Sequence, residues 1–313
     1  MDVPLYVWAA TLGAIGAMLA LDLLVLHRDA HEVSMREAAL TSAMWVTLGV
    51  LFGVGVWAFA GGERAGEYFA GYLIEKSLSV DNIFVFALIF GYFAVPAKYQ
   101  HRVLFWGVVG ALVMRAGFIA AGATLLDRFS WTVYVFGAFL LVTGVRMARQ
   151  RDEHLDPGRN PLLRLLRRRV PMTDGYEGQR FVVRRAGRLL ATPMLAVLLV
   201  VETTDVVFAV DSIPAIFAVT DEPFLVFTSN AFAILGLRAL YFLLAGMITR
   251  FAYLKLGLAA VLVFVGVKLV LTHVVHLPIW LSLGVIAGIL GTALVASVVR
   301  PPAPAADELE AAH

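Results

Sequence analysis

The chain has 313 residues, of which 60% are hydrophobic and only 15% are charged, and its mean hydropathy is +0.83. A water-soluble globular chain has about 25% charged residues, so the composition excludes that class and indicates a protein that crosses a membrane several times. The formal net charge is +2, and the absence of cysteine excludes disulfides, cysteine-ligated zinc, iron–sulfur centres and thiol redox chemistry.

Nine apolar runs are long enough to cross a bilayer, which takes about 20 residues in a helix. No membrane β-strand pattern of about ten alternating residues appears. We therefore predict an all-α polytopic membrane protein with about nine transmembrane helices in one domain over residues 1–300. The second run has a helix-start signal, Ser34-Met-Arg-Glu37, which fits a capping box. The nine runs cover residues 4–26, 39–60, 67–93, 103–126, 131–148, 189–220, 224–248, 253–272 and 277–299.

Lysine and arginine predict the orientation of these helices. Of the 25 basic residues, 19 fall in or beside the odd-numbered loops and the C-terminal end, whereas only Arg64 and Arg128 fall on the other side. Loops rich in lysine and arginine stay in the cytoplasm. The bias therefore predicts an N-terminus outside the cell and a C-terminus in the cytoplasm.

The fifth loop, residues 149–188, is the only long polar segment, and we expect it to lie on anionic lipid headgroups in the cytoplasm. A regulatory or RNA-binding arm is the alternative. We do not expect a nucleic-acid partner, because no aromatic residues interleave the arginines. Residues 301–313 are typical of a short, disordered acidic tail. The arginines that make the loop basic include Arg164, Arg167, Arg168, Arg169, Arg184, Arg185 and Arg188.

Two related acidic motifs lie inside apolar runs. The first contains Glu75 and Asp81-Asn82-Ile; the second contains Asp205 and Asp211-Ser-Ile. In each, five residues separate the first acid from the second, so Glu75 matches Asp205 and Asp81 matches Asp211. Acids within a membrane cost about 2.5–3.5 kcal/mol each on insertion scales. Their concentration in matching motifs therefore predicts a compensating interaction.

The likeness between the two stretches extends beyond the acids. Arg115-Ala is followed after 29 residues by Gly144-Val-Arg, and Arg238-Ala is followed after 28 residues by Gly266-Val-Lys. Each unit has three predicted spans, and this odd number makes the second unit enter the membrane from the opposite side. The pattern predicts a 3+3 inverted repeat, with repeat one at about 67–148 and repeat two at about 189–272. In such proteins the binding site lies at the midplane between the repeats.

The motifs together supply carboxylate, amide and hydroxyl oxygens, which hard divalent cations such as magnesium, calcium and manganese prefer. Pro214 cannot donate to the carbonyl of Val210, so we expect a helix break there that frees a further oxygen. The candidate metal ligands are Glu75, Asp81, Asn82, Glu202, Asp205, Asp211 and Ser212.

Two other interpretations of the acids remain open. Intramembrane bases can neutralise them in purely structural ion pairs, or the acids can relay protons, which is compatible with cation binding in an antiporter. A further acid, Asp22, lies near the cytoplasmic end of the first run, where we expect an interfacial salt-bridge cluster. The available bases are Lys76, Arg115, Arg238 and Lys268.

The motifs Asp22…Arg28-x2-His31-Glu32, Glu75-x5-Asp81-Asn-Ile-Phe and Glu202-x2-Asp205-x5-Asp211-Ser-Ile-Pro-Ala resemble those of the TerC family of integral membrane proteins. That family is named for tellurium resistance and is similar to the LysE-type transporter superfamily, which has 3+3 inverted repeats. Its bacterial members are implicated in manganese(II) efflux, in the response to alkaline pH and in supplying metal to exported enzymes. The resemblance covers about residues 18–272. It implies that the five motif acids carry the metal pathway: Glu75, Asp81, Glu202, Asp205 and Asp211.

We therefore expect a manganese(II) exporter in the bacterial inner membrane, driven by the proton gradient, with no bound cofactor. One alternative is a membrane scaffold that assembles or metallates other proteins without transport. Another is an exporter of a different cation, such as calcium. We do not expect an enzyme, because no nucleophile–base pair or cofactor fingerprint is visible in the sequence.

Overall fold

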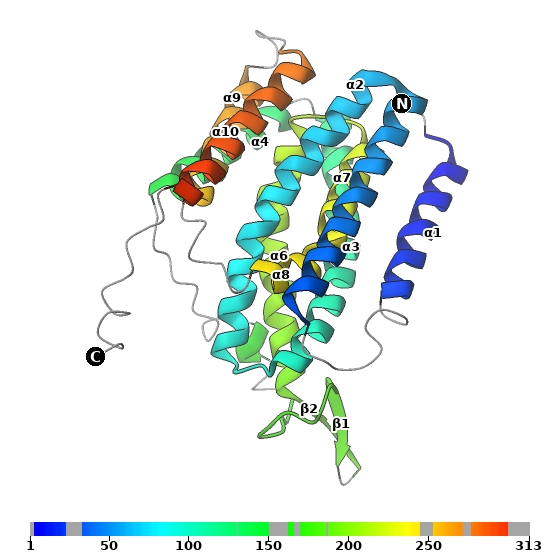
Figure 1. Cartoon of the computed structure of the whole chain (residues 1–313), viewed down its shortest axis with the longest axis vertical. Helices are drawn as coiled ribbons and strands as arrows, with labels where there is room; N and C mark the ends of the chain where they lie inside the picture. Colours follow the sequence, from blue (N-terminus) through cyan, green and yellow to red (C-terminus); the bar gives the residue numbers. More distant parts are fainter. Residues whose placement is uncertain are drawn as a thin grey trace.

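The computed structural model describes residues 3–22, 33–129, 131–149, 162–165, 170–185, 187–244, 253–271 and 277–299, without the side chains of Asp81, Phe84, Asp211 and Lys255. Helices dominate these residues, which confirms the all-α prediction (Figure 1). The main helices are α1 (Leu5–Leu21), α2 (Met35–Tyr92), α3 (Ala97–Arg128), α4 (Thr132–Arg149), α6 (Pro193–Phe217), α7 (Pro223–Leu235), α8 (Leu237–Leu244), α9 (Leu254–Val270) and α10 (Ile279–Val299).

Helix α2 is a long helix folded back on itself at a glycine. The backbone of Gly61 has φ 87° and ψ 174°, a conformation that residues with a Cβ rarely adopt. On either side of it the chain forms two antiparallel arms, as Figure 1 shows. The phenol of Tyr68 donates to the carbonyl of Gly49 at 2.9 Å, so residues of the two arms lie side by side. The two arms correspond to the predicted runs 39–60 and 67–93.

The predicted start of α2 is confirmed. Ser34 has extended backbone angles, and its side chain accepts a hydrogen bond from the Glu37 amide at 3.3 Å. This contact satisfies one of the four amides that a helix leaves unpaired at its N-terminus.

A second break divides the predicted run 224–248 into α7 and α8, which meet at Gly236 with a bend of 41°. A Cβ on Gly236 would lie 2.9 Å from Trp45 Cβ and 3.0 Å from Lys76 Nζ. The ammonium of Lys76 also donates to the Ala233 carbonyl at 3.1 Å. Helix breaks at membrane depth need such partners, because lipid offers none. The bend thus depends on a small residue and on a cation from α2.

Helices α4 and α9 pack along a seam of small residues. A Cβ on Gly144 would lie 2.9 Å from the Ala259 carbonyl oxygen, and one on Gly266 would lie 3.0 Å from the Gly137 carbonyl oxygen. Close backbone approach through small residues is the usual basis of helix packing in membranes. If the Gly144-Val and Gly266-Val pairs correspond, as predicted, each of these contacts is the repeat-related image of the other. The inverted repeat itself stays a prediction.

The basic segment before α6 contains a short hairpin rather than the start of a span. Strands β1 (Val182–Arg185) and β2 (Arg188–Ala191) pair antiparallel, with Val182 opposite Ala191. Helix α6 then begins at Pro193, which suits the first helical turn because its missing amide would have no partner there. The predicted start of this span at residue 189 is therefore wrong, because strand pairing takes up those apolar residues.

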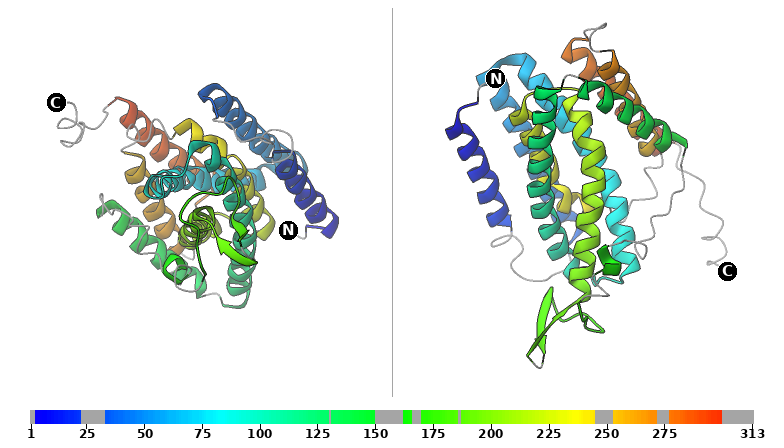
Figure 2. Two further views of the ribbon diagram at one scale, coloured as in Figure 1. Left: turned by 90° about the horizontal axis from the view of Figure 1, so that it is seen from below. Right: turned by 180° about the vertical axis from the view of Figure 1, so that it is seen from behind.

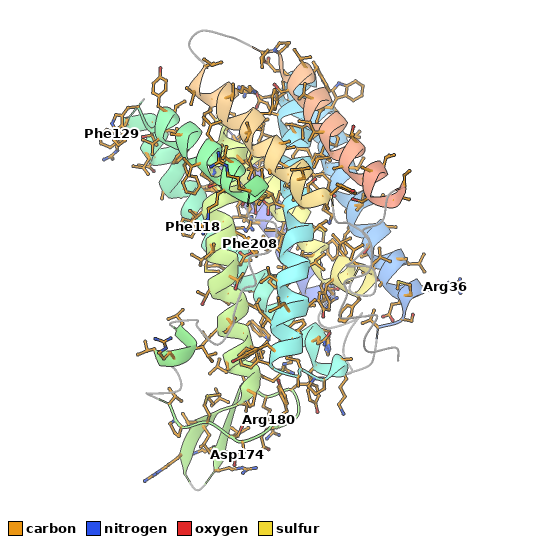
Figure 3. All side chains as sticks on the ribbon, turned by 90° about the vertical axis from the view of Figure 1, so that its left-hand side faces the viewer. Arg36, Phe118, Phe129, Asp174, Arg180 and Phe208 are labelled. Carbon is orange, nitrogen blue, oxygen red and sulfur yellow. The ribbon has the colours of Figure 1, made fainter. Side chains whose placement is uncertain are left out.

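The hairpin projects from one end of the bundle, beyond the N-terminus of α6 (Figure 2). Figure 3 places Asp174 and Arg180 at that end and Phe129, which follows α3, at the other. Among the described helices, five are long and apolar enough to span a membrane, or six if the bent α7–α8 pair counts as one span. The polytopic architecture agrees with the prediction, while the exact number of nine spans stays a prediction.

Candidate functional site

A single buried arginine joins the two acidic motifs. Arg115 lies in α3, and only 1% of its surface is exposed. Its Nη1 donates to Glu75 Oε1 at 2.6 Å, and its Nη2 and Nε donate to the two carboxylate oxygens of Asp205 at 3.3 and 3.4 Å. Glu75 comes from α2 and Asp205 from α6, and both are buried. The two acids that the motif alignment matches therefore meet across one guanidinium.

Two further polar side chains complete this cluster. Asn230 of α7 donates from Nδ2 to Glu75 Oε2 at 3.2 Å, and Ser212 Oγ accepts a hydrogen bond from Arg115 Nη1 at 3.1 Å. Each of the four oxygens of Glu75 and Asp205 thus accepts a hydrogen bond from a described side chain. Sequence reasoning missed Asn230, because a lone amide in an apolar run looks no different from a packing residue. We call Glu75, Arg115, Asp205, Ser212 and Asn230 the Arg115 cluster.

Glu202 lies one turn before Asp205 on α6 and packs against the backbone of α3. A Cβ on Gly110 would come within 2.1 Å of Glu202 Oε1, so the carboxylate occupies space that only a glycine leaves free. Gly110 is a second residue that sequence reasoning missed. A glycine within an apolar helix was the available signal, since glycine there marks a close approach.

The other predicted ligands are placed only in part. Asn82 is buried, and its side-chain oxygen has no hydrogen-bond partner among the described residues. Asp81 and Asp211 belong to α2 and α6, but their side chains lie outside the described part of the structure, so their predicted facing arrangement stays a prediction. Within the described residues no three His, Asp or Glu side chains are grouped closely enough to hold a metal ion.

The space around the Arg115 cluster is closely packed. A cavity beside Asp205 measures only about 10 Å³ and is lined by apolar residues of α2, α3 and α6, with Leu237 from α8. A cavity must be at least about 10–15 Å³ to hold one water molecule. This cavity is therefore too small for a hydrated cation.

The predicted break in α6 is wrong. The helix is continuous from Pro193 to Phe217 with Pro214 inside it. The amide of Ala218 donates to the Pro214 carbonyl at 3.0 Å, so the ladder resumes directly after the proline. Membrane helices tolerate proline when neighbouring groups satisfy the freed backbone. The break expected in this helix occurs instead at Gly236, in the next predicted span.

The other intramembrane bases do not all pair with the motif acids. Lys76 donates to a backbone carbonyl at the α7–α8 bend, as described above. Arg238 of α8 forms an ion pair with Asp22, which follows α1. Both partners are buried, so Asp22 does take part in a salt bridge, while its interfacial depth stays a prediction. The residues expected around it, 27–32, lie outside the described residues.

A separate polar cluster links the bend of α2 to the α6–α7 connection. Arg64 forms ion pairs with Glu67 at 2.9 Å and with Glu222 at 3.1 Å, and the hydroxyl of Thr220 donates to Glu67 at 2.7 Å. The Arg64 side chain is 30% exposed, in contrast to the buried Arg115. These residues lie on the side that the charge bias assigns to the exterior.

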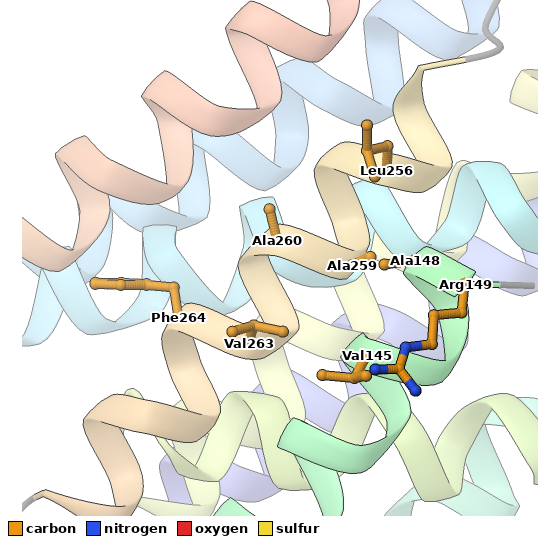
Figure 4. A pocket seen from close by; sticks show the side chains of 8 residues that line it. All are labelled: Val145, Ala148, Arg149, Leu256, Ala259, Ala260, Val263 and Phe264. Carbon is orange, nitrogen blue, oxygen red and sulfur yellow. The ribbon is translucent and has the colours of Figure 1, made fainter.

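A groove of about 430 Å³ lies between α4 and α9, and no residue of the Arg115 cluster is among the described residues that line it (Figure 4). Among the described residues that line it there is no carboxylate to serve as a ligand for a hard cation. Its only charged lining residue is Arg149, at the C-terminal end of α4. The lining residues are Val145, Ala148, Arg149, Leu256, Ala259, Ala260, Val263 and Phe264.

Comparisons with known proteins agree with the resemblance found in the motifs. Residues 60–303 match a family model described as the integral membrane protein TerC family. The chain is 54% identical over 293 residues to STKORF319 of Myxococcus xanthus, an uncharacterized membrane protein, covering 94% of this chain and 92% of that protein. It is 50% identical to the Alx proteins of Salmonella typhi (92% of this chain, 92% of that protein) and Escherichia coli strain K12 (90% and 91%), whose names propose a membrane-bound redox modulator. No solved structure matches the chain.

Proposed function

The chain belongs to the TerC family of integral membrane proteins, and we propose that it exports a divalent cation, manganese(II), from the cytoplasm. One observation carries this proposal: carboxylates of two matching motifs, on α2 and α6, converge in the interior of an apolar helix bundle. Buried intramembrane acids are rare and expensive, and they mark ion and proton pathways in membrane proteins.

The chemistry of these side chains supports a hard cation. Glu75, Asp205 and Glu202 offer carboxylate oxygens, and Asn82 has a buried amide oxygen with no partner among the described residues. Oxygen donors of this kind suit manganese, magnesium and calcium rather than copper(I), which prefers sulfur. This chain has no cysteine and therefore cannot carry out redox chemistry that depends on a thiol.

In the proposed mechanism the cation binds between α2 and α6, and the two predicted repeats rock to expose it to either side. Protons that return down their gradient neutralise the acids after the cation leaves. In the arrangement described here Arg115 compensates the charge of Glu75 and Asp205. We propose no chemical reaction and hence no enzymatic activity.

A membrane scaffold is the second candidate, and the Arg115 cluster itself favours it. Since each oxygen of Glu75 and Asp205 already has a protein donor, the cluster can hold α2, α3, α6 and α7 together without any ion. Buried ion pairs with purely structural roles are well known. Transport and scaffold differ in whether a cation crosses the membrane.

Flux through proteoliposomes that contain only this protein separates the two candidates. We expect a pH gradient to drive manganese(II) across the membrane, with calcium(II) and magnesium(II) as competitors that report the ion preference. Glu75→Gln, Glu202→Gln, Asp205→Asn, Asp81→Asn and Asp211→Asn should each abolish flux in protein that still inserts. No manganese flux above empty liposomes would contradict the transporter. Normal flux in all five variants would contradict the site.

Export also requires the proposed orientation in the bacterial inner membrane, with the N-terminus outside. The chain has no cysteine, so single cysteines report topology without background. We expect a membrane-impermeant maleimide to label Trp131→Cys in intact cells and to label Asp174→Cys only after lysis. The reverse pattern would show the opposite orientation and contradict export by this route.

A further inference from the structure

We propose that Arg115 is a built-in counter-ion that a divalent cation must displace from Glu75 and Asp205 before binding there. This inference rests on the proposed transport function and assigns to Arg115 a role that the motif acids alone do not define. In this role Arg115 positions the carboxylates and compensates their charge when no cation is bound.

The hydrogen-bond geometry makes the arginine and the cation competitors. Three of the four oxygens of Glu75 and Asp205 accept from Arg115, and the fourth accepts from Asn230. A hard cation takes carboxylate oxygens at about 2.0–2.6 Å and needs several of them. The guanidinium nitrogens stand 2.6–3.4 Å from the same oxygens. A dication among these oxygens would therefore meet a positive charge in direct contact, so one of the two must leave.

Arginine suits this role because it cannot lose its charge. The guanidinium keeps its proton in proteins, whereas a buried lysine readily becomes neutral. Arg115 can therefore leave the acids only by moving. When the cation departs, the Arg115 guanidinium pairs with Glu75 and Asp205 again. The two buried carboxylates are then not left without a counter-charge while the transporter changes conformation.

The chain supplies its own control for this idea. Arg238 is the counterpart of Arg115 in the predicted repeat, and it is buried and ion-paired as well. Its ion-pair partner, Asp22, belongs to neither acidic motif. Loss of Arg238 should therefore affect stability without affecting the competition at Glu75 and Asp205.

The test compares manganese binding and thermal stability in purified Arg115→Met, Arg115→Lys and Arg238→Met. Binding is followed by the electron paramagnetic resonance signal of free manganese(II), and stability by the melting temperature with and without manganese(II). Without the competing charge, Arg115→Met should bind manganese about tenfold more tightly than the unchanged protein. Its melting temperature should be lower without manganese and should rise more steeply when manganese is added.

The two other variants, Arg115→Lys and Arg238→Met, show whether a change in manganese affinity comes from the charge of Arg115. Arg115→Lys replaces the forked guanidinium with one ammonium group, which can become neutral when buried. Its manganese affinity should therefore fall between those of Arg115→Met and the unchanged protein, and it serves as the test variant if Arg115→Met does not accumulate. Arg238→Met should melt lower with unchanged manganese affinity. Equal or weaker binding by both Arg115 variants would overturn the counter-ion role while leaving transport intact. An unchanged protein that neither binds nor transports manganese would overturn the proposed function, and this inference with it.

Discussion

Arg115 and Arg238 are matched by the predicted repeat, and both are buried, yet the fold gives them different partners. Arg115 contacts one acid from each motif and so links α2 and α6 through α3. Arg238 pairs with Asp22, at the end of α1 and outside both predicted repeats. A buried arginine in a membrane can therefore serve either the acidic site or the attachment of a peripheral helix.

The backbone before each arginine differs as well. Helix α3 is continuous from Ala97 to Arg128, so Arg115 lies on an uninterrupted helix face. The chain before Arg238 bends by 41° at Gly236, two residues earlier. We infer that this bend directs Arg238 away from the acids and towards α1. If the predicted repeat is correct, one local break distinguishes its two matched arginines.

Removal of an arginine's acidic partner should have the largest effect at both places. Asp205→Ala removes one of the two carboxylates that Arg115 contacts, and Asp22→Ala removes the acid that pairs with Arg238. Loss of one partner of a buried ion pair typically costs about 3–5 kcal/mol. We expect both variants to lose folded protein, measured as membrane abundance and melting temperature. Manganese efflux per folded molecule should vanish only in Asp205→Ala. Equal efflux per molecule in the two variants would remove the functional distinction between the arginines.

The bend before Arg238 should be the next most sensitive point. In Gly236→Ala the new Cβ would meet Trp45 at 2.9 Å, and overpacking of this kind costs about 1–3 kcal/mol. We expect a lower melting temperature with unchanged efflux per folded molecule. Gly55→Ala is the matched control, because a Cβ there meets nothing within 4 Å. Equal melting of both variants would argue against a tightly packed bend.

Gly110, which lies on α3 with Arg115, tests how sensitive the acidic site is to packing, as Gly236 does for the bend before Arg238. In Gly110→Ala the new Cβ would collide with the carboxylate of Glu202 and force it aside. Misplacement of a reacting or binding group by about 1 Å can cost up to 100-fold, and we expect at least about a tenfold loss of efflux here, with little loss of abundance. Gly117→Ala on the same helix has open space at its Cβ and should behave normally. Full efflux in Gly110→Ala would show that the position of Glu202 is unimportant.

The partly exposed Arg64 should matter least for stability. Its pairs with Glu67 and Glu222 are partly exposed, and such pairs contribute about 0–1 kcal/mol. Arg64→Gln should therefore shift the melting temperature only slightly, and the shift should shrink as salt concentration rises. A loss as large as that of Asp22→Ala would mean that exposure does not separate this arginine from the two buried ones.

Local patterns in the sequence determined much of this protein. Long apolar runs fix the membrane class, because only helices satisfy their own backbone in lipid. The start of α2 follows from Ser34 and Glu37, since a capping box involves four consecutive residues. The spacing of the two motifs also picked out Glu75 and Asp205 as a matched pair.

Only the tertiary structure decided which residues compensate those acids and where the helices break. Glu75 and Arg115 are 40 residues apart in the chain, and Arg115 and Asp205 are 90 apart, so no local pattern records their contact. Pro214 stays within a helix, whereas Gly236 ends one, because packing against Trp45 and the Lys76 ammonium determines whether a bend is supported there. Local preference sets the elements, while burial without water forces each charge to find a partner that only the packed helices provide.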